Sequence, residues 1–333
     1  MADRYLYMGA HPAFTRNVGA ISTSTTAATF NSTYTDQSVS IGNSTSHFFT
    51  DFQTGSGVDD YVTTGETLWL RFDGYYSGGS ANINMAVLVD NSDQMLFRIR
   101  VNSSTVTRIE YNSGTLTTPS WTQLGTDITT TSGTRYTWVL KLTIDAAGTA
   151  HAYEFYKDNV LALSGTFSMS LLTRVDAVKF GDTSNVGCYI SQVLASVGIS
   201  LVGSFCAALK ASGAGSNSGM TGAYTDVNEV TLSDATVVSS NTAAQRTTFA
   251  IADLPALSGL VVGTEQRHCF RANNDGGSGP QNIKPVIRQS GVDTVGSAVT
   301  GIGTGMSTFN ISYGLTYTQI NAAGFELGWE SSA

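Results

Sequence analysis

The sequence has few charged residues. Lys, Arg, Asp and Glu together make up 13% of its 333 residues, while hydrophobic residues make up 41%; the charged share is about half the usual one. Disordered chains combine low hydrophobicity with high net charge, so this composition argues against disorder. It favours a β protein whose exposed faces carry hydroxyl and amide groups.

Basic residues are also too few for a nucleic-acid surface. The 17 Lys and Arg are outnumbered by 25 Asp and Glu, which gives a formal net charge of −8 and a pI near 4.9. Binding along a phosphate backbone needs clustered cations. Arg98, Arg100 and Arg108 come closest to a cluster, but their alternation fits a solvated strand face better than a phosphate site. We therefore expect no nucleic-acid partner.

Cysteine is scarce as well, with three residues in the chain. Cys188, Cys206 and Cys269 are odd in number, widely spaced and flanked by apolar residues, which favours buried free thiols over a disulfide framework. Free thiols fit folding in a reducing cytoplasm. The first twelve residues lack the basic start and apolar run of a secretion signal, so none is expected.

No uninterrupted apolar run is long enough to suggest a membrane span. The longest stretch of low charge, residues 188–209, is broken by serine and glycine and alternates at Val193, Ala195, Val197, Ile199 and Leu201. That alternation predicts two consecutive strands rather than a spanning helix. We expect no membrane insertion, and we interpret residues 176–210 as the junction where one β domain runs into a second.

Short segments with strand character fill the first two hundred residues. Each has β-branched or aromatic residues, period-two alternation and a Gly, Asn, Asp or Ser boundary. Turn chemistry separates them, as at Gly78-Gly79, Asn112 to Gly114, Ala146 to Gly148 and Asp158-Asn159. An antiparallel sandwich or jelly roll follows. The predicted strands are residues 47–52, 66–76, 82–90, 95–101, 107–112, 121–128, 135–145, 151–159, 160–167, 176–180 and 189–194.

The order of these segments resembles the concanavalin A-like, or laminin G-like, β-sandwich. The likeness is carried by ETLWLRFD, MLFRIRV, the long hairpin from Thr137 to Gly165 and DAVKFG. The resemblance implies a sandwich over residues 45–197, preceded by an N-terminal strand and arm in residues 1–44, and a smaller jelly roll over residues 198–333.

Five short elements follow one another in the second half of the chain: Val202-Gly203-Ser204, residues 213–222, Val227-Asn228-Glu229, residues 234–240 and Gly324-Phe325-Glu326. Their order resembles a module of tailed-phage and gene-transfer-agent virion proteins, in which a laminin G-like domain precedes a small jelly roll. Ser204 and Asn228 stand where that module carries acids, so a cation site of the acidic version is not expected.

What the resemblance implies is a structural protein located in the virion and made in the host cytoplasm. It would be a capsid decoration, head spike, fibre or tail-associated protein, acting on no substrate and needing no cofactor. Its partners would be capsid, neck or tail proteins and further copies of itself. We hypothesise that the second domain supplies the oligomeric or anchoring contact and that the sandwich faces solvent.

The sequence offers only weak evidence for a group of catalytic residues. A glycosidase needs two acids at a defined separation, one of them with a raised pKa. Asp59-Asp60 lies in a glycine-containing loop, and Glu326 with Glu330 is the other pair. The four histidines have no metal-ligand spacing, and the glycine loops lack the helix and lysine of a phosphate site. Polysaccharide hydrolysis is therefore the least favoured function, and no metal site is expected.

The sequence also suggests two kinds of binding surface as alternatives to a catalytic site. Aromatic rings stack on sugars, and loops rich in Asn and Asp offer hydrogen bonds or calcium ligands. The alternative interpretation is that the rings pack at a sheet edge or at a subunit contact. Low charge and an apolar chain end favour contact with copies of the chain or a scaffold. The candidate contacts to a host surface glycan are Tyr75, Tyr76, Trp121, Asp90 and Asp93, and those to a protein interface are Phe325, Leu327 and Trp329.

Overall fold

The computed structural model shows an almost wholly β protein, as the sequence predicts. The chain divides into two compact units, residues 1–208 and 209–333, and each is described here by itself. The structure describes residues 4–333 apart from 10–15, 19–20, 31, 33–37, 42–45, 53–58, 79–81, 182–186, 206–208, 229–236, 255–265, 275, 278 and 306.

The first sheet of unit 1 has eight antiparallel strands. β17 lies inside it: β7 pairs along one side, while β4 pairs with the first half of the other side and β1 (Arg4–Gly9) with the second half. The order is β14 (Val160–Phe167), β13 (His151–Lys157), β12 (Arg135–Thr143), β7 (Thr67–Tyr76), β17 (Cys188–Val197), β4 (Ser38–Ile41) and β3 (Ile21–Ser24).

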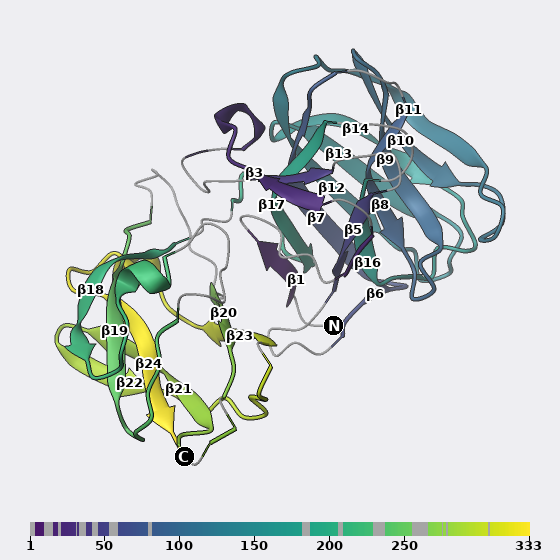
Figure 1. Ribbon diagram of the computed structural model, residues 1–333. Coiled ribbons are helices and arrows are strands. Elements are labelled where there is room, and N and C mark those ends of the chain that lie inside the picture. Colours follow the sequence, from purple (N-terminus) through teal and green to yellow (C-terminus); the bar gives the residue numbers. More distant parts are fainter. Residues whose placement is uncertain are drawn as a thin grey trace. The chain divides into compact units, whose positions relative to one another are not determined.

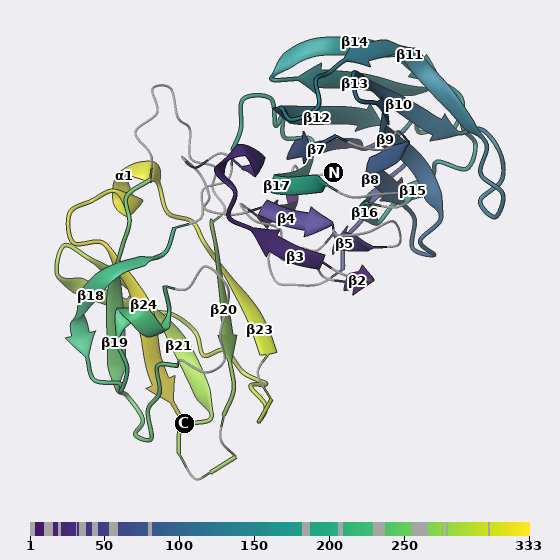
Figure 2. The ribbon, with the colours of Figure 1, turned by 45° about the horizontal axis from the view of Figure 1, so that its top comes forward.

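The second sheet of unit 1 has seven strands and faces the first (Figure 1). Figure 2 shows its edge strand β11 beside the edge strand β14 of the other sheet. A short pair, β6 (Val62–Thr63) with β15 (Arg174–Val175), and the 3-10 turn η1 (Ala27–Thr29) complete the described elements of the unit. The order is β11 (Trp121–Thr129), β10 (Val106–Asn112), β9 (Met95–Ser103), β8 (Ile83–Val89), β16 (Ala177–Phe180), β5 (His47–Asp51) and β2 (Arg16–Val18).

Aromatic side chains fill the space between the two sheets. Trp138, Leu140 and Leu142 alternate along β12 and are at most 1% exposed, as the period-two pattern predicts. The Trp138 ring stacks on Phe155 of β13 with 5.3 Å between ring centres. Phe72 meets Phe180 of the opposite sheet edge-on at 5.4 Å. These contacts join the sheets into one core.

Tight turns set the register of the hairpins. Asp158 and Asn159 have φ of 51° and 65° and join β13 to β14. Both residues tolerate the left-handed region that a two-residue hairpin requires. Gly148, with φ of 72°, closes the turn before β13, and its N–H donates to the Asp145 carbonyl at 3.0 Å. The predicted turns at these two positions are confirmed.

The junction region differs from its prediction. β17 ends at Val197, and no strand includes Ile199 or Leu201, so the expectation of two consecutive strands is wrong. Gly198 turns the chain at φ 75°, and Leu201 packs on the outer face of the eight-stranded sheet. Its apolar side chain is 1% exposed because it covers Trp69 and Val139.

The N-terminal residues that the structure describes belong to the sheets of unit 1, through β1 to β4. Cys188 is a buried free thiol, and burial raises its pKa to about 12. Cys206 and the side chain of Cys269 lie outside the described residues. Over the described part of the chain, the structure contains no helix both long and apolar enough to cross a membrane.

Unit 2 contains a five-stranded antiparallel sheet and a separate two-stranded ribbon. Two short turns of helix, η2 (Tyr224–Asp226) and α1 (Tyr317–Ile320), lie between strands. The sheet order is β18 (Ala211–Ser218), β19 (Arg246–Ile251), β24 (Glu326–Ser332), β21 (Asn282–Gln289) and β22 (Val292–Val295), and the ribbon is β20 (Gln266–Ala272) with β23 (Ser307–Tyr313).

The motif Gly324-Phe325-Glu326 leads into the central strand of that sheet. Gly324 has φ of 73°, a conformation that favours glycine, and the Phe325 N–H donates to the Ala322 carbonyl at 3.0 Å. β24 then starts at Glu326. Glu229 and residues 234–236 of the other motifs lie outside the described residues.

Candidate functional site

One tryptophan and six polar side chains gather on the outer face of the seven-stranded sheet. Phe97, Ile99 and Val101 of β9 point into the core, and the alternation of a strand therefore turns the residues between them outward. Arg98 pairs with Glu110 on β10, which pairs in turn with Gln123 on β11. The set, called the arginine–tryptophan surface below, is Arg98, Arg100, Arg108, Glu110, Trp121, Gln123 and Asp127.

Each arginine of this surface faces a carboxylate. Arg98 donates to Glu110 at 2.5 Å, and Arg100 lies 3.6 Å from the other oxygen of that carboxylate. Arg108 donates from Nε and Nη2 to both oxygens of Asp127, at 2.6 and 3.0 Å. A bidentate pair of this kind fixes the orientation of the guanidinium group.

Hydrogen bonding stabilises the charged forms of Arg108 and Asp127. The hydrogen bond from Arg108 lowers the pKa of Asp127, and the same bond raises the pKa of Arg108. The Arg98 guanidinium lies 3.9 Å from the centre of the Trp121 ring, a cation–π contact. The half-buried ring of Trp121 is thus fixed against the Arg98 guanidinium.

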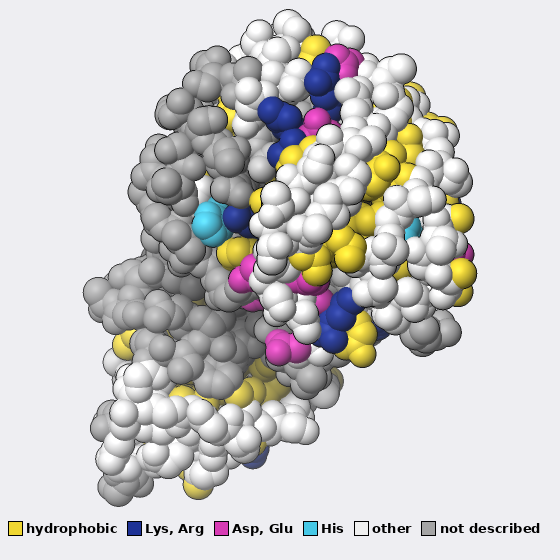
Figure 3. Space-filling model, turned by 90° about the vertical axis from the view of Figure 1, so that its right-hand side faces the viewer, with side chains coloured by type: hydrophobic (Ala, Val, Ile, Leu, Met, Phe, Trp, Pro, Cys, Tyr) yellow, Lys and Arg dark blue, Asp and Glu magenta, His cyan; other side chains and the backbone are white. Residues whose placement is uncertain are grey.

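The surface carries an excess of positive charge in an acidic chain. Three guanidinium groups face two carboxylates, whereas the chain has a net charge of −8. The side chains of Arg100 and Arg108 are 21% and 30% exposed, so a ligand can reach them. The face of the molecule in Figure 3 is mostly uncharged, with Lys and Arg in a few separate groups.

The structure brings some of the predicted glycan contacts together and separates others. Trp121 opens β11, and the loop from Asp90 to Asp93 joins β8 to β9, so both lie at the same end of the seven-stranded sheet. Tyr75 and Tyr76 end β7 in the other sheet, at the opposite end of the sandwich.

Burial distinguishes the two tyrosines. Tyr76 is 5% exposed and belongs to the core, so its ring is not presented to solvent. Tyr75 is half-buried and packs edge-on against Tyr189 with 5.6 Å between ring centres. A role for these tyrosines in sugar binding remains a sequence-based prediction, and internal packing accounts for the contacts of both.

The Asp90 to Asp93 loop uses its first carboxylate to hold its own turn. Asp90 Oδ1 accepts the N–H groups of Ser92 and Gln94 at 2.8 and 2.9 Å. Asp93 adopts φ of 57°, which aspartate tolerates in tight turns. Among the residues that the structure describes, no three His, Cys, Asp or Glu side chains gather as metal ligands do.

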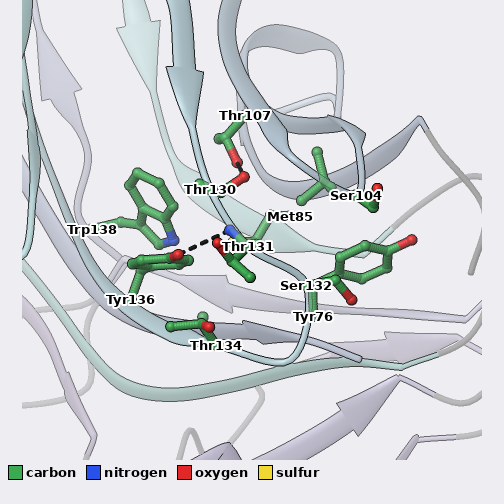
Figure 4. Close-up of a pocket in the computed structure, with 12 residues that line it drawn as sticks. Tyr76, Met85, Ser104, Thr107, Thr130, Thr131, Ser132, Thr134, Tyr136 and Trp138 are labelled. Carbon is green, nitrogen blue, oxygen red and sulfur yellow. Dashed lines mark hydrogen bonds between the residues drawn. The ribbon is translucent and has the colours of Figure 1, made fainter. Parts of the chain in front are cut away.

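A small cavity lies at the end of the sandwich where β7 finishes. Its volume is about 10 Å³, and Figure 4 shows Tyr76, Tyr136 and Trp138 around it with serine and threonine hydroxyls. The Thr131 N–H donates to the Tyr136 hydroxyl at 2.9 Å across its rim. The volume accommodates about one water molecule, which is far too little for a sugar ring.

The acids Asp59 and Asp60 are not arranged for hydrolysis. Asp60 accepts a hydrogen bond from Arg4 at 2.7 Å, and its neighbour Asp59 is exposed. The Arg4 side chain also donates to the Glu66 carboxylate at 2.8 Å. These contacts join β1 to the segment before β7, which is a structural use of the acid.

Glu326 and Glu330 lie on one face of β24 in unit 2, each 7% exposed. Burial alone would raise the pKa of Glu326, but hydrogen bonds from Ser216 and Thr248 outweigh it and lower the pKa below its ordinary 4.5. Arg246 donates to Glu330 at 2.6 Å and lowers that pKa as well. Both groups are therefore carboxylates at neutral pH, whereas a glycosidase requires one protonated acid.

The same network predicts that unit 2 loses stability in acid. The pKa values of Glu326, Glu330 and Asp293 are lower in the folded state than their ordinary 4.5, 4.5 and 3.8. The stabilisation that these three carboxylates provide is fully present at a pH above their ordinary pKa values. It is lost as the pH falls through the lower pKa values of the folded state. We therefore expect the free energy of unfolding of unit 2 to fall as the pH drops below about 4.5, and partial exposure of Arg246 limits the size of the effect.

Thermal unfolding of the full chain between pH 7 and pH 3 measures this effect. The Glu330→Gln variant is the matched control, since its unfolding temperature should fall less steeply below pH 4.5. An unfolding temperature of unit 2 that stayed constant, or rose, across this range would contradict the prediction.

The predicted interface residues lie on or beside the central strand of unit 2. Phe325 is 5% exposed and buried within the unit. Leu327 and Trp329 are half-buried on the face of β24 opposite Glu326 and Glu330, and β24 lies between β19 and β21. Contact with another protein through these residues would use the sheet face, not its edge, and stays a prediction.

Sequence reasoning missed a buried ion pair on the outer face of the eight-stranded sheet. Arg71 and Asp73 are 4% and 2% exposed, and Arg71 Nη2 donates to Asp73 at 3.0 Å. Arg71 Nη1 also donates to the carbonyl of Gln192, which lies in a bulge of β17 at φ 56°. Spacing along β7 places the two residues on one face, but nothing in the local sequence indicates their burial.

His151 is held inside the sandwich by backbone groups. Its Nδ1 accepts the Asp145 N–H at 3.1 Å, so Nε2 carries the proton that is donated to the Met169 carbonyl at 2.8 Å. His11 and the side chain of His268 lie outside the described residues.

No protein-family model matches the chain, and no curated protein sequence matches it. Among solved structures, similarity extends to the tail fibre protein gp63.1 of an E. coli phage, at 15% identity and a TM-score of 0.28 over 41% of this chain and 15% of that one. Cellulose induced protein Cip1 has 14% identity and a TM-score of 0.37 over 58% of this chain and 90% of its own.

A third similar structure is the CBM2 module of the evolved Dit of Lactobacillus casei BL23 phage J-1. It shares 8% identity and a TM-score of 0.36 over 60% of this chain and 97% of the module. Likenesses of this size identify neither a family nor a function. The fold assignment therefore rests on the strand order and register given above.

Proposed function

We propose that the chain is a structural protein of a phage virion that works through surface contacts and performs no catalysis. The virion setting is supported by the sequence resemblance of both halves. The candidate acids support the absence of catalysis, since Asp60 pairs with Arg4 and the pKa values of Glu326 and Glu330 are lowered. Capsid, neck or tail proteins would be its partners.

The observation that carries a contact-based function is the edge strand β14. Seven of its eight residues are exposed or half-buried, and Val160 and Leu161 are 69% and 51% exposed. No residue of Val160–Phe167 is charged and none is proline, although charge and proline are the usual protection of a sheet edge. A bulge between Leu161 and Leu163 is its only irregularity within the strand.

A second copy of the chain is the partner that this edge suits. Two-fold pairing of antiparallel edges sets each strand against its own copy, so a charged residue would meet a like charge. β14 contains none, and Leu163 to Phe167 form a regular segment beyond the bulge. The eight-stranded sheet would then continue across the two copies.

Light scattering after size-exclusion chromatography tests this contact. The full chain is expected to form a dimer or higher oligomer, and Thr166→Lys is expected to shift it toward the monomer. Ala147→Lys, an exposed position in the turn before β13, is the matched control and should leave the oligomer unchanged. A monomeric wild-type chain, or equal effects of both variants, would show that β14 is not the interface.

Attachment to the particle is assigned to the second half of the chain, with the sandwich displayed outward. Particles assembled with a chain truncated after residue 208 should lack the protein, whereas full-length protein should sediment with the particles in a density gradient. Incorporation of the truncated chain at the full level would place the anchor in unit 1 instead.

A second candidate function, recognition of a host surface glycan, is favoured by the fixed tryptophan of the arginine–tryptophan surface. Trp121 lies at an open sheet face, at the same end as the Asp90 to Asp93 loop, and sugar rings stack on such indole faces. Binding of the full chain to any member of a glycan array supports this function, and a blank array would exclude it.

A further inference from the structure

We infer that the arginine–tryptophan surface binds an acidic oligosaccharide, with the carboxylate of one sugar on Arg108 and the pyranose face of another on Trp121. This inference rests on the second candidate function and names its ligand class. The observation that carries it is a fixed indole ring and two accessible guanidinium groups on one sheet face, with Trp121 opposite Asn112 and Arg108 four residues along β10 from that position.

The ring is prepared for stacking before any ligand arrives. Glu110 holds Arg98 at 2.5 Å, and the Arg98 guanidinium lies 3.9 Å from the centre of the Trp121 ring. One face of the indole is thereby occupied, which directs a stacked ligand to the other face. Because Arg98 is only 11% exposed, its role is to position the ring and not to contact the ligand.

The charge of the ligand follows from the guanidinium groups around the ring. Arg100 hydrogen-bonds Asn82 and lies 3.6 Å from Glu110, a distance that leaves its charge only partly compensated. Arg108 uses Nε and Nη2 on Asp127 and is 30% exposed. Its remaining nitrogen, Nη1, can donate to a carboxylate outside the surface.

The two acids of the surface limit how much negative charge a ligand can carry. Glu110 and Asp127 would repel the closely spaced phosphates of a nucleic acid, and the chain as a whole is negative. An oligosaccharide with one carboxylate per ring can place one charge on a guanidinium and the C–H face of another ring on the indole. Hexuronic and sialic acids have this chemistry.

Matched glycans test the inference on the full chain. The array carries sialic, glucuronic and galacturonic acid oligosaccharides, each beside a partner whose carboxyl groups are reduced to alcohols. We expect at least one acidic member to bind about tenfold or more tightly than its reduced partner, since a charge-assisted bond is lost on reduction. Binding should weaken as salt concentration rises.

Amino-acid substitutions test whether the glycan binds at the arginine–tryptophan surface. Arg108→Gln and Trp121→Ala should each weaken the acidic glycan about tenfold, and Arg108→Lys should retain part of the affinity. Lys141→Gln is the matched control, because Lys141 is also an ion-paired cation, 31% exposed, but lies on the eight-stranded sheet. Thermal unfolding verifies that each variant is folded.

The possible outcomes distinguish the inference of an acidic ligand from the more general function of glycan recognition on which it rests. Equal binding of acidic and reduced partners would overturn the acidic ligand while leaving glycan recognition intact. Acidic binding that is unchanged in Arg108→Gln and Arg108→Lys would place the site elsewhere and overturn the inference. A wholly blank array would overturn both.

Discussion

Trp138→Ala is expected to lower the free energy of unfolding of unit 1 by about 3–5 kcal/mol. Trp138 is fully buried between the two sheets, stacked on Phe155 and 5.6 Å from the Tyr136 ring centre. Removing the indole leaves a large void, and the hydrogen-bonded strands β7 and β13 on either side prevent β12 from collapsing into it. Denaturant unfolding followed by circular dichroism measures the loss.

Trp138→Phe is the control for this prediction. Within the described residues the Trp138 Nε1–H has no hydrogen-bond partner although it is buried. Phenylalanine keeps the stacking on Phe155 and removes that unpaired donor, so we expect a cost of only about 1–2 kcal/mol. A phenylalanine variant as unstable as the alanine variant would show that packing around the ring is not the source of the effect.

Arg4→Ala should destabilise unit 1 by roughly 2–3 kcal/mol, because it leaves a buried carboxylate without its partner. The Glu66 side chain is 2% exposed and receives Arg4 Nη1 at 2.8 Å, while Asp60 receives Arg4 Nε at 2.7 Å. The hydrogen bond to Glu66 is the largest influence that raises the pKa of Arg4. Partial exposure of Arg4, at 29%, keeps the effect below that of a fully buried pair.

A double-mutant cycle isolates the Arg4–Glu66 interaction. Glu66→Gln removes the charge that Arg4→Ala leaves unpaired, so the double variant should be more stable than the sum of the single effects predicts. Denaturant unfolding of all four proteins provides the coupling energy. Strict additivity would mean that the buried charge is not what makes the loss of Arg4 costly.

Strand positions in unit 1 were predictable because a half-buried strand shows its period locally. The segment of residues 95–101 became β9, in which buried residues alternate with half-buried ones from Phe97 to Val101. The Asp158-Asn159 turn was equally local, since two residues with positive φ join adjacent strands. None of these features depends on distant parts of the chain.

Burial of the outer sheet faces was not predictable in the same way. Val139 is fully buried although it alternates with Trp138, because Leu201 reaches back from beyond the last strand of the sandwich. Tyr76, a candidate glycan contact in the sequence, belongs to the core at the end of β7. In each case the covering residue lies far away in sequence, where periodicity carries no information.

The sequence singled out individual residues of the candidate site but did not predict that they lie together. Trp121, Arg98 and Arg108 each stood out in the sequence, but as unrelated features. Their meeting depends on the order β9, β10 and β11 and on a bulge between Thr107 and Ile109 that places Asp127 beside Arg108. Registers of that kind are set by the whole sheet.

Quantitative mass spectrometry of purified virions tests the proposed function most directly. We predict that peptides from both units are present at a fixed copy number relative to the major capsid protein and remain after nuclease and high-salt washing. Absence of the chain from washed particles that are otherwise complete and infectious would contradict the proposal that it is a structural protein of the virion.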